Sequence, residues 1–403
     1  MKQPPGRLSK DHVLIVLFGI ICAIFISLDK PLHGDENHFY RTLVQFGQSD
    51  ISVIIKDYNQ VTGPVFFSLY GFIGRYCDFS KEILRLINLL PFIFFLLLFR
   101  ASSKNILANK QESFQALLLS LLNPYMVGIA IYLYTDGINM LAIYLFYYAV
   151  VSKRLPMLIP ATALALCTRQ YSVYAIAASS LYILTSRQYE LKSIILAAVF
   201  VALGCVPFVY LYVLWGGIAP KQGLAHWVPN QSVIYHLDYI TTYVSFMTIY
   251  ALPAIVYKRR ALVNLVKTTL GTKGMVGTAL LSLFAFIFPT QISEAIATTS
   301  SKIDSVGYIH SAMKHVPVAH IDQALIWLFF LVGLAVLIAF FIEDFKEVKR
   351  MATGINFFLT INILIFLLMM PLSYQVWEKY LIVILPLFVL RILNADSRDG
   401  ANT

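Results

Sequence analysis

Long apolar runs separated by short polar breaks make up most of the chain. Most of these runs have the roughly 17 to 25 residues that an α-helix needs to cross a bilayer. They lack the alternation of apolar and polar residues that is typical of membrane β-barrel strands. The pattern therefore predicts helical spans, about twelve in number. We expect them near residues 11–28, 83–100, 114–131, 137–151, 156–168, 170–186, 193–215, 238–257, 275–290, 321–342, 352–371 and 377–394.

One apolar run, VTGPVFFSLYGFIGRY at 61–76, does not fit this series. It opens with Gly63-Pro64, which leaves only about a dozen apolar residues for a helix, too few to cross a bilayer. We expect it to be re-entrant or to lie in the membrane interface. The stretch 37–47 before it is amphipathic, and we expect its apolar side to rest on the interface. The sequence thus predicts an interfacial, helical first outer loop.

Composition agrees with a membrane protein. The 403 residues are 59% hydrophobic and 13% charged, and the mean hydropathy is +0.73, too apolar for the surface of a soluble domain of this length. There is no long polar linker, low-complexity tract or internal repeat. We therefore expect one all-α polytopic membrane domain over residues 1–403.

The charges and the cysteines further limit the partners and the kinds of site that this protein is expected to have. With a cytoplasmic N-terminus, most of the 31 Lys and Arg fall on cytoplasmic segments, as the positive-inside rule requires. We therefore attribute the net charge of +10 to the orientation of the chain in the membrane, and we expect no nucleic-acid partner. The four cysteines show no CxxC pair and no metal-like spacing to histidine, so we expect neither a disulfide framework nor a metal site.

In this topology the unusual polar residues collect on the outer face, where a site for a lipid-anchored substrate with a polar head is expected. They are Asp35, Glu36, Tyr134, Asp136, Arg169, Gln170, Gly216, Gly217, Lys221, His226, His236 and Glu378.

Each of these groups has more than one interpretation. Asp35 and Glu36 are acids suited to the first turn of a helix, or one is a general base. Residues 156–186 are long for one span and short for two, which predicts two short helices with Arg169 in a recess. The counter-ion of Arg169 is then Asp136 or a phosphate. His226 and His236 are solvated loop histidines or substrate contacts.

Six segments, in order, carry a resemblance to a known family. They are Asp35-Glu36 with TGPVFFSLYGFIGRY, LRLINLL at 84–90, NPYMVGIAIYLYTDGINM at 123–140, TRQYSVY at 168–174, WGGIAPKQGLAH at 215–226, and WEKYLIVILPLFVLRILN at 377–394. Together they resemble the membrane glycosyltransferases of the GT-C superfamily. Within it they are similar to the dolichyl-phosphate-glucose alpha-1,2-glucosyltransferases, which add the last glucose to a dolichol-linked oligosaccharide.

The resemblance implies a GT-C-type bundle and an inverting transferase. The enzyme would move a hexose, glucose in that family, from a polyprenyl-phosphate carrier to a lipid-linked glycan or another outer-face acceptor. Asp35 would be the catalytic base, with Glu36 second or as its orienting partner. Arg169, Lys221 and His226 would bind the donor phosphate. Asp136, Tyr134, Gln170, Gly216, Gly217, His236 and Glu378 would bind substrate.

The resemblance implies no cofactor and no nucleotide, and the chain has neither a Gly-rich phosphate loop nor an Asp-x-Asp motif. A relative in a prokaryotic cell membrane is expected, with the endoplasmic reticulum membrane as the alternative, and with the active site on the non-cytoplasmic face. A rival class is a lipid-linked-sugar flippase or transporter, which would be expected to spread charge through the bilayer midplane. A structural membrane subunit would leave the clustered Asp, Arg and His unexplained.

Overall fold

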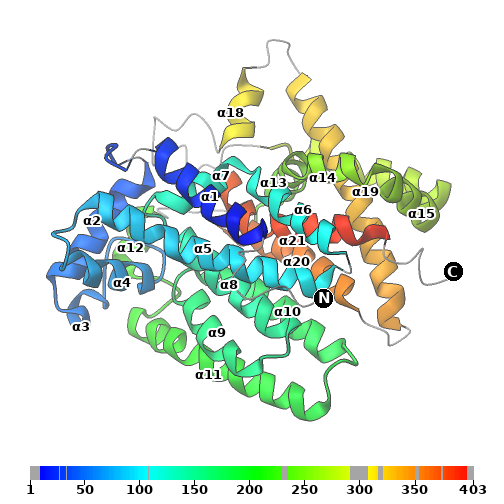
Figure 1. Cartoon of the computed structure of the whole chain (residues 1–403). Coiled ribbons are helices and arrows are strands. Elements are labelled where there is room, and N and C mark those ends of the chain that lie inside the picture. The colour runs from blue at the N-terminus through cyan, green and yellow to red at the C-terminus, as the bar shows by residue number, and fades with distance from the viewer. Residues whose placement is uncertain are drawn as a thin grey trace. The chain divides into compact units, whose positions relative to one another are not determined.

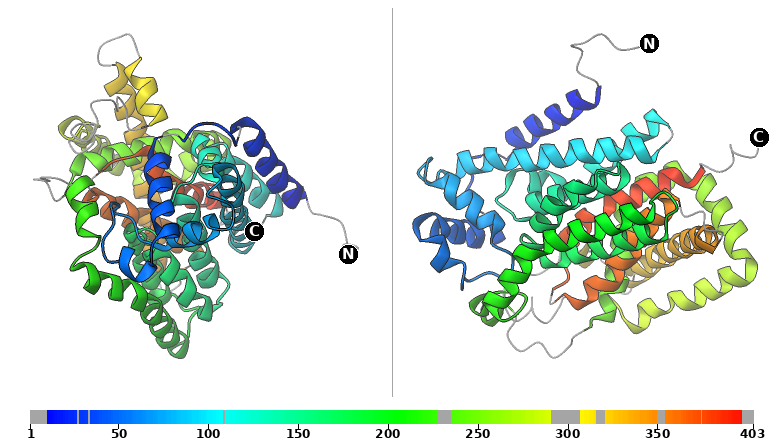
Figure 2. Two further views of the ribbon diagram at one scale, coloured as in Figure 1. Left: turned by 90° about the vertical axis from the view of Figure 1, so that its left-hand side faces the viewer. Right: turned by 90° about the horizontal axis from the view of Figure 1, so that it is seen from below.

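The computed structural model describes residues 10–26, 28–32, 34–107, 109–227, 235–290, 307–315, 321–349, 354–373 and 375–396. Within these ranges all the regular elements are α-helices or short 3-10 helices (Figures 1 and 2). Long apolar runs produce this result, since a helix satisfies its own backbone hydrogen bonds without water. The all-α prediction is confirmed for the described part of the chain.

The chain divides into two compact units built from interleaved segments. The first unit consists of Met1–Asn105, Asn109–Ser172 and Val199–His226. The second consists of Ile106–Ala108, Val173–Ala198 and Trp227–Thr403. Because both units are discontinuous in sequence, a boundary could not be read from linker composition, and the single domain over 1–403 stays a prediction.

The first unit holds the helices that carry most of the predicted site residues. These are α1 (Lys10–Ile26), α2 (Asp35–Gln48), α3 (Ile51–Ile54), α4 (Val65–Gly74), α5 (Lys81–Ile106), α6 (Lys110–Leu121), α7 (Pro124–Ile131), α8 (Asp136–Val151), η1 (Leu155–Met157), α9 (Leu158–Leu166), η2 (Gln170–Ser172), α12 (Lys221–Trp227) and the C-terminal part of α11 (Leu191–Trp215).

The second unit holds the remaining helices and the N-terminal part of α11. These helices are α10 (Val173–Thr185), α13 (Leu237–Tyr250), α14 (Leu252–Tyr257), α15 (Arg259–Ser282), α16 (Phe284–Ile287), α18 (Tyr308–Lys314), α19 (Ile321–Lys349), α20 (Ile355–Met369), η3 (Met370–Leu372), η4 (Glu378–Val383), α21 (Leu385–Leu393) and η5 (Asn394–Asp396).

Five helical segments in the described residues are long and apolar enough to cross a membrane by length and composition. They are Lys81–Ile106, Leu191–Trp215, Arg259–Ile287, Ile321–Lys346 and Ile355–Leu372. A sixth exists if α6 and α7, which are bent by 76°, count as one broken span. The bend falls at Asn123-Pro124, because proline disfavours helical backbone at the residue before it. The Asn123 side chain then caps α7 by accepting a hydrogen bond from the Tyr125 N–H at 2.9 Å.

The structure thus supports a multi-pass membrane protein but shows fewer than twelve spans of full length. Other expected spans coincide with shorter helices, such as the 16-residue α8 and the 13-residue α10. The predicted break inside 156–186 is present, because α9 ends at Leu166 and α10 begins at Val173.

The segment expected to form the first outer loop is helical, as predicted, but its apolar side faces the protein. α2 buries Phe39, Leu43 and Phe46, which join Phe66 and Phe67 of α4 in one apolar cluster. Phe39 and Phe67, for example, lie with ring centroids 5.9 Å apart. The expectation that the apolar side of 37–47 rests on the interface is therefore wrong, because α4 covers it.

The α2–α4 contact depends on two glycines at the crossing point. A Cβ atom added to Gly71 would lie 2.6 Å from the Leu43 carbonyl oxygen and 2.8 Å from the Gly47 nitrogen. A Cβ atom on Gly47 would lie 2.7 Å from the Gly71 carbonyl oxygen. Backbone atoms cannot move aside as a flexible side chain can, so both helices need glycine here.

We predict that Gly71→Ala destabilises the protein by about 1–3 kcal/mol, the usual cost of forcing an extra methyl group into a packed contact. The melting temperature in detergent measures this loss. Gly277→Ala in α15 is the matched control, because a Cβ there meets nothing within 4 Å. Equal melting temperatures for the two variants would show that α2 and α4 separate without cost.

Candidate functional site

A fully buried ion pair fixes the start of α2. The Arg85 side chain on α5 donates from Nε to Glu36 Oε1 at 2.8 Å and from Nη2 to Glu36 Oε2 at 2.6 Å, and neither side chain is exposed to solvent. The Leu133 N–H also donates to Glu36 Oε1 at 3.1 Å. Both carboxylate oxygens of Glu36 are therefore engaged inside the protein.

Arg85 also holds the chain that precedes α2. Its Nη1 donates to the carbonyl oxygens of Leu28 and Lys30, both at 2.7 Å, and its Nη2 donates to that of Pro31 at 3.2 Å. Sequence analysis missed Arg85 as a site residue. The available signal was a charged residue inside the otherwise apolar LRLINLL, which in a membrane chain demands a partner.

Asp35 has a different environment from its neighbour, since its side chain is half-buried. It begins α2 directly after Gly34. Tyr134 lies nearby, because a Cβ on Gly34 would be 4.0 Å from the Tyr134 hydroxyl. Burial raises the pKa of Tyr134, and the charges of Asp35, Glu36 and Asp136 raise it further. The phenol is therefore a protonated donor beside Asp35 at neutral pH.

The turn between α7 and α8 is held from α5. Asn88 donates from Nδ2 to the carbonyl oxygens of Ile129 at 3.0 Å and Tyr132 at 2.8 Å. Its Oδ1 accepts a hydrogen bond from the Tyr70 hydroxyl at 2.7 Å. These bonds place Tyr134 and the first residue of α8, Asp136, next to the start of α2.

Asp136 and Arg169 form a second buried ion pair, with Asp136 Oδ2 3.1 Å from Arg169 Nη2. Asp136 is 0% exposed and Arg169 7% exposed, so both partners of this pair are buried. The internal counter-ion considered for Arg169 is likewise found. The guanidinium carbon of Arg169 also lies 6.0 Å from the centroid of the Tyr171 ring.

The break that carries Arg169 is paired with the Gly63-Pro64 segment. The Gly63 N–H donates to the Thr168 carbonyl oxygen at 3.0 Å, and the Val65 N–H donates to that of Cys167 at 3.3 Å. A Cβ on Gly63 would lie 2.0 Å from the Cys167 carbonyl oxygen. Glycine is required at 63 for this approach, which explains why the 61–76 run opens as it does.

The loop after α11 joins the same region. Gln170 donates from Nε2 to the carbonyl oxygens of Val61 at 3.1 Å and Ile218 at 3.0 Å. The Gln222 N–H donates to Asp57 Oδ1 at 3.0 Å. A Cβ on Gly223 would lie 2.2 Å from the carbonyl oxygen of Gln60. Segments 57–63, 167–170 and 218–223 thus meet within the first unit.

The flexible and charged residues of this loop face solvent. Lys221 and His226 are exposed on the seven-residue α12. Gly216 has a φ of 67°, and a Cβ on either Gly216 or Gly217 meets nothing within 4 Å. The structure therefore anchors the loop at Gln222 and Gly223 and leaves the Lys221 and His226 side chains exposed.

Three buried polar side-chain atoms near these segments have no hydrogen-bond partner among the described residues. They are Thr62 Oγ1, Thr135 Oγ1 and Asp136 Oδ1. Buried polar groups are rarely left unsatisfied, and functional sites are among the exceptions. Thr135 and Asp136 belong to the segment that also carries the predicted site residue Tyr134, whereas Thr62 lies in the segment that pairs with the break at Arg169.

Two predicted site residues, His236 and Glu378, belong to the second unit. The His236 ring stacks on Tyr239 with centroids 4.5 Å apart. Glu378 is buried and accepts hydrogen bonds from the Tyr250 hydroxyl and from the Ile309 N–H, the latter at 3.1 Å. Within this unit Glu378 therefore fixes the start of α18.

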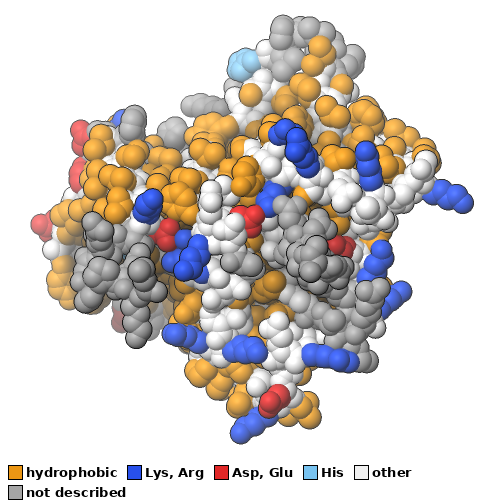
Figure 3. Space-filling view, turned by 45° about the vertical axis from the view of Figure 1, so that its right-hand side comes forward, with side chains coloured by type: hydrophobic (Ala, Val, Ile, Leu, Met, Phe, Trp, Pro, Cys, Tyr) orange, Lys and Arg blue, Asp and Glu red, His pale blue; other side chains and the backbone are white. Residues whose placement is uncertain are grey.

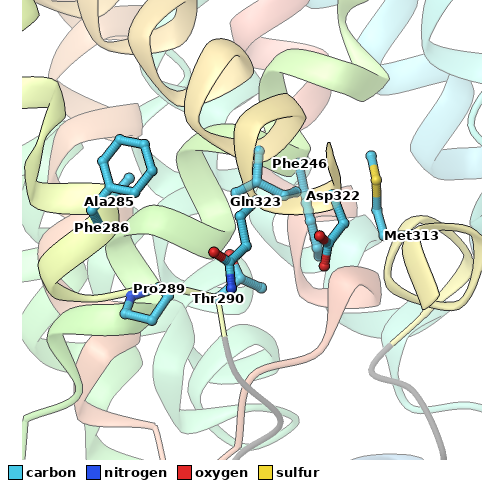
Figure 4. Close-up of a pocket in the computed structure, with 9 residues that line it drawn as sticks. Phe246, Ala285, Phe286, Pro289, Thr290, Met313, Asp322 and Gln323 are labelled. Atoms are coloured by element: carbon cyan, nitrogen blue, oxygen red, sulfur yellow. The ribbon is translucent and has the colours of Figure 1, made fainter. Parts of the chain in front are cut away.

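The second unit also contains a pocket of about 200 Å³ between α13, α16, α18 and α19 (Figure 4). Its lining is apolar at Phe246, Phe286 and Met313 and polar at Asp322 and Gln323. Within the described residues, no group of three His, Cys, Asp or Glu side chains could hold a metal ion.

Comparison with known proteins gives no further guide: no family model, curated protein or solved structure matches this chain.

We predict that Glu36→Gln destabilises the protein by about 3–5 kcal/mol, because it leaves the Arg85 charge buried without a counter-charge. Thermal unfolding of purified protein measures the loss. Glu82→Gln is the matched control on α5, since the Glu82 side chain is 43% exposed and pairs with Lys81 at 3.7 Å. An exposed pair contributes at most about 1 kcal/mol. Equal stability of the two variants would contradict the anchoring role of Glu36.

Proposed function

We propose that this protein is an inverting membrane glycosyltransferase of GT-C type. It moves a hexose, glucose by the resemblance, from a polyprenyl-phosphate carrier of the dolichyl-phosphate kind to a lipid-linked glycan or another acceptor. The reaction takes place on the non-cytoplasmic face of a prokaryotic cell membrane or of the endoplasmic reticulum. The proposal includes the finer architecture of about twelve spans, in which the short helices α8, α9 and α10 pair or tilt to complete the bundle.

The observation that supports it most is the meeting of a carboxylate and a recessed arginine in one unit. Asp35 and Asp136 both lie close enough to Tyr134 to raise its pKa, after the larger effect of burial, and Asp136 contacts Arg169 directly. Transfer of a sugar from a phosphate needs a base for the acceptor and a cation for the leaving group. Asp35 and Arg169 supply these two groups.

Asp35 and Glu36 have different roles in the proposed mechanism because their contacts differ. Both Glu36 oxygens are engaged by Arg85, and one also accepts from Leu133, so Glu36 is a positioning residue that fixes the first turn of α2. Asp35 is half-buried at the same turn. Asp35 takes the proton of the acceptor hydroxyl, whose oxygen forms the new bond to the sugar C1.

The leaving group departs as the polyprenyl phosphate, which retains the electron pair of the broken C1–O bond. Arg169 stabilises this charge, since its planar guanidinium matches phosphate oxygens. Asp136 orients Arg169 through a single contact at 3.1 Å, and its other oxygen, which has no hydrogen-bond partner among the described residues, is suited to a sugar hydroxyl. Lys221 adds positive charge from the exposed α12, and His226 on the same helix is a further contact for the phosphate.

Other predicted contacts take supporting roles in the proposal. The Gln170 amide is bonded to two backbone carbonyls, so it holds the loops together. Tyr134 donates to substrate beside Asp35. Gly216 and Gly217 let the loop after α11 move toward the donor. His236 and Glu378 belong to the second unit, and their substrate-binding role rests on the resemblance alone.

A flippase or transporter is the alternative proposal, and one buried charge cluster bears on it. Asp344 and Arg391 are both fully buried, with Arg391 Nη2 3.0 Å from Asp344 Oδ1. Asp344 lies near the C-terminal end of α19, which runs from Ile321 to Lys349. Charge at a helix end gives less support to a transport path than charge at the midplane would.

The direct test is transfer of label by the purified full chain in detergent. We expect label to move from a polyprenyl-phosphate hexose to a lipid-linked glycan, and not from a nucleotide sugar. Asp35→Asn should lower turnover by about a hundredfold or more, the scale of general-base catalysis, with donor binding retained. Failure of every polyprenyl-phosphate hexose, or full activity of Asp35→Asn, would refute the mechanism.

A double-mutant cycle at Arg169 and Asp136 separates phosphate binding from charge neutralisation. Arg169→Ala and Asp136→Ala each strand a buried charge, so each should lower the melting temperature, and the double variant should recover part of the loss. Donor binding should be lost in Arg169→Ala and stay lost in the double variant, while Arg169→Lys retains part of it. Donor binding restored in the double variant would show that Arg169 only neutralises Asp136.

A further inference from the structure

Helix α15 consists of two helical parts joined at Gly271. Gly271 has a φ of 58° and a ψ of −175°, values that interrupt the helix. An L-residue rarely adopts this backbone, whereas glycine does so without a steric cost. The chain therefore changes direction between residues 259–270 and the apolar residues that follow.

The second part is the more apolar of the two and covers most of the span expected at 275–290. Residues after Gly271 include Met275, Val276, Leu280 and Leu281, all exposed apolar side chains. Its end is held on α19, where Trp327 Nε1 donates to Ser282 Oγ at 3.0 Å. Exposed apolar side chains on a membrane-spanning helix face lipid, so this part continues into the bilayer.

The first part is amphipathic and strongly basic. Leu262 and Leu265 are 3% and 9% exposed and face the protein, while Arg259, Arg260 and Lys267 are exposed. Between Ala251 and Thr290 the sequence has five basic residues and no Asp or Glu. A helix with this pattern, joined to a span, lies at the membrane surface, where anionic lipid attracts it.

The basic residues at the start of this part also border a hollow. Tyr257, Lys258, Arg259, Arg260 and Ala261 line a pocket of about 300 Å³. Lys258 is 8% exposed, and its ammonium lies 5.9 Å from the Tyr257 ring centroid. The first turn of α15 contains no acidic residue, so the positive end of the helix dipole adds to these cations. The face drawn in Figure 3 carries many Lys and Arg side chains, together with several acidic ones and large apolar areas.

We propose that the pocket at residues 257–261 binds the phosphate of an anionic phospholipid headgroup. Arg259 and Arg260 bind the phosphate oxygens, and Lys267 extends the contact along the leaflet. The acyl chains lie beside the exposed apolar residues after Gly271. This site is separate from the chemistry proposed for the first unit and does not depend on it.

The test uses the purified full chain and short-chain phosphatidylglycerol, with phosphatidylcholine of equal chain length as the neutral probe. Native mass spectrometry measures retained lipid, and melting temperature measures stabilisation. We expect phosphatidylglycerol to bind and stabilise the wild type, and its affinity to fall as salt rises. Arg259→Gln with Arg260→Gln should weaken binding about thirtyfold, at roughly fivefold per surface charge.

Arg187→Gln with Lys192→Gln is the matched control, since both side chains are exposed and the same charge is removed. It should bind phosphatidylglycerol like the wild type, and Arg259→Lys with Arg260→Lys should retain most of the affinity. Equal loss in the control pair would show a general charge effect and overturn the site. Binding without salt dependence, or stabilisation by inorganic phosphate alone equal to that by phosphatidylglycerol, would overturn a lipid headgroup as the ligand.

Discussion

The arrangement of the first unit depends on the cost of burying Arg85. A guanidinium has five N–H donors and cannot lose its charge in a protein. Arg85 makes five hydrogen bonds, two to Glu36 and three to the carbonyl oxygens of Leu28, Lys30 and Pro31. Without all of them the desolvation penalty would exceed the attraction of the pair. The ion pair therefore fixes where the chain enters α2, and with it the position of Asp35.

Two other buried arginines, Arg391 and Arg169, have different sets of partners. Arg391 in the second unit bonds to Glu343, Asp344 and Thr360, which joins α21 to α19 and α20, but its Nη1 has no partner among the described residues. Arg169 contacts Asp136 through one oxygen only. Arg85 makes five hydrogen bonds within the protein, so its role is to hold the structure together. Arg169 lies beside Asp136, whose second carboxylate oxygen has no partner among the described residues, and this pair is suited to binding a polar substrate.

Close backbone approaches complete the site. Gly63 against Cys167 and Gly223 against Gln60 leave no room for a side chain, and both contacts join loops that are far apart in sequence. Tight loop packing at one end of a helical unit places several short polar segments side by side. This is how a chain that is 59% hydrophobic gathers charged and polar groups in a single region.

The sequence by itself determined the helical class, the short α4 and the break that carries Arg169, because run length and proline position act locally. It could not separate Asp35 from Glu36, which are neighbours in one helical turn. It also missed Arg85 and faced the apolar side of α2 toward the membrane. These features were decided by the tertiary structure, since burial, ion pairing and helix crossing depend on residues distant in sequence. Arg85 lies 49 positions from Glu36, and only folding brings the two charges together.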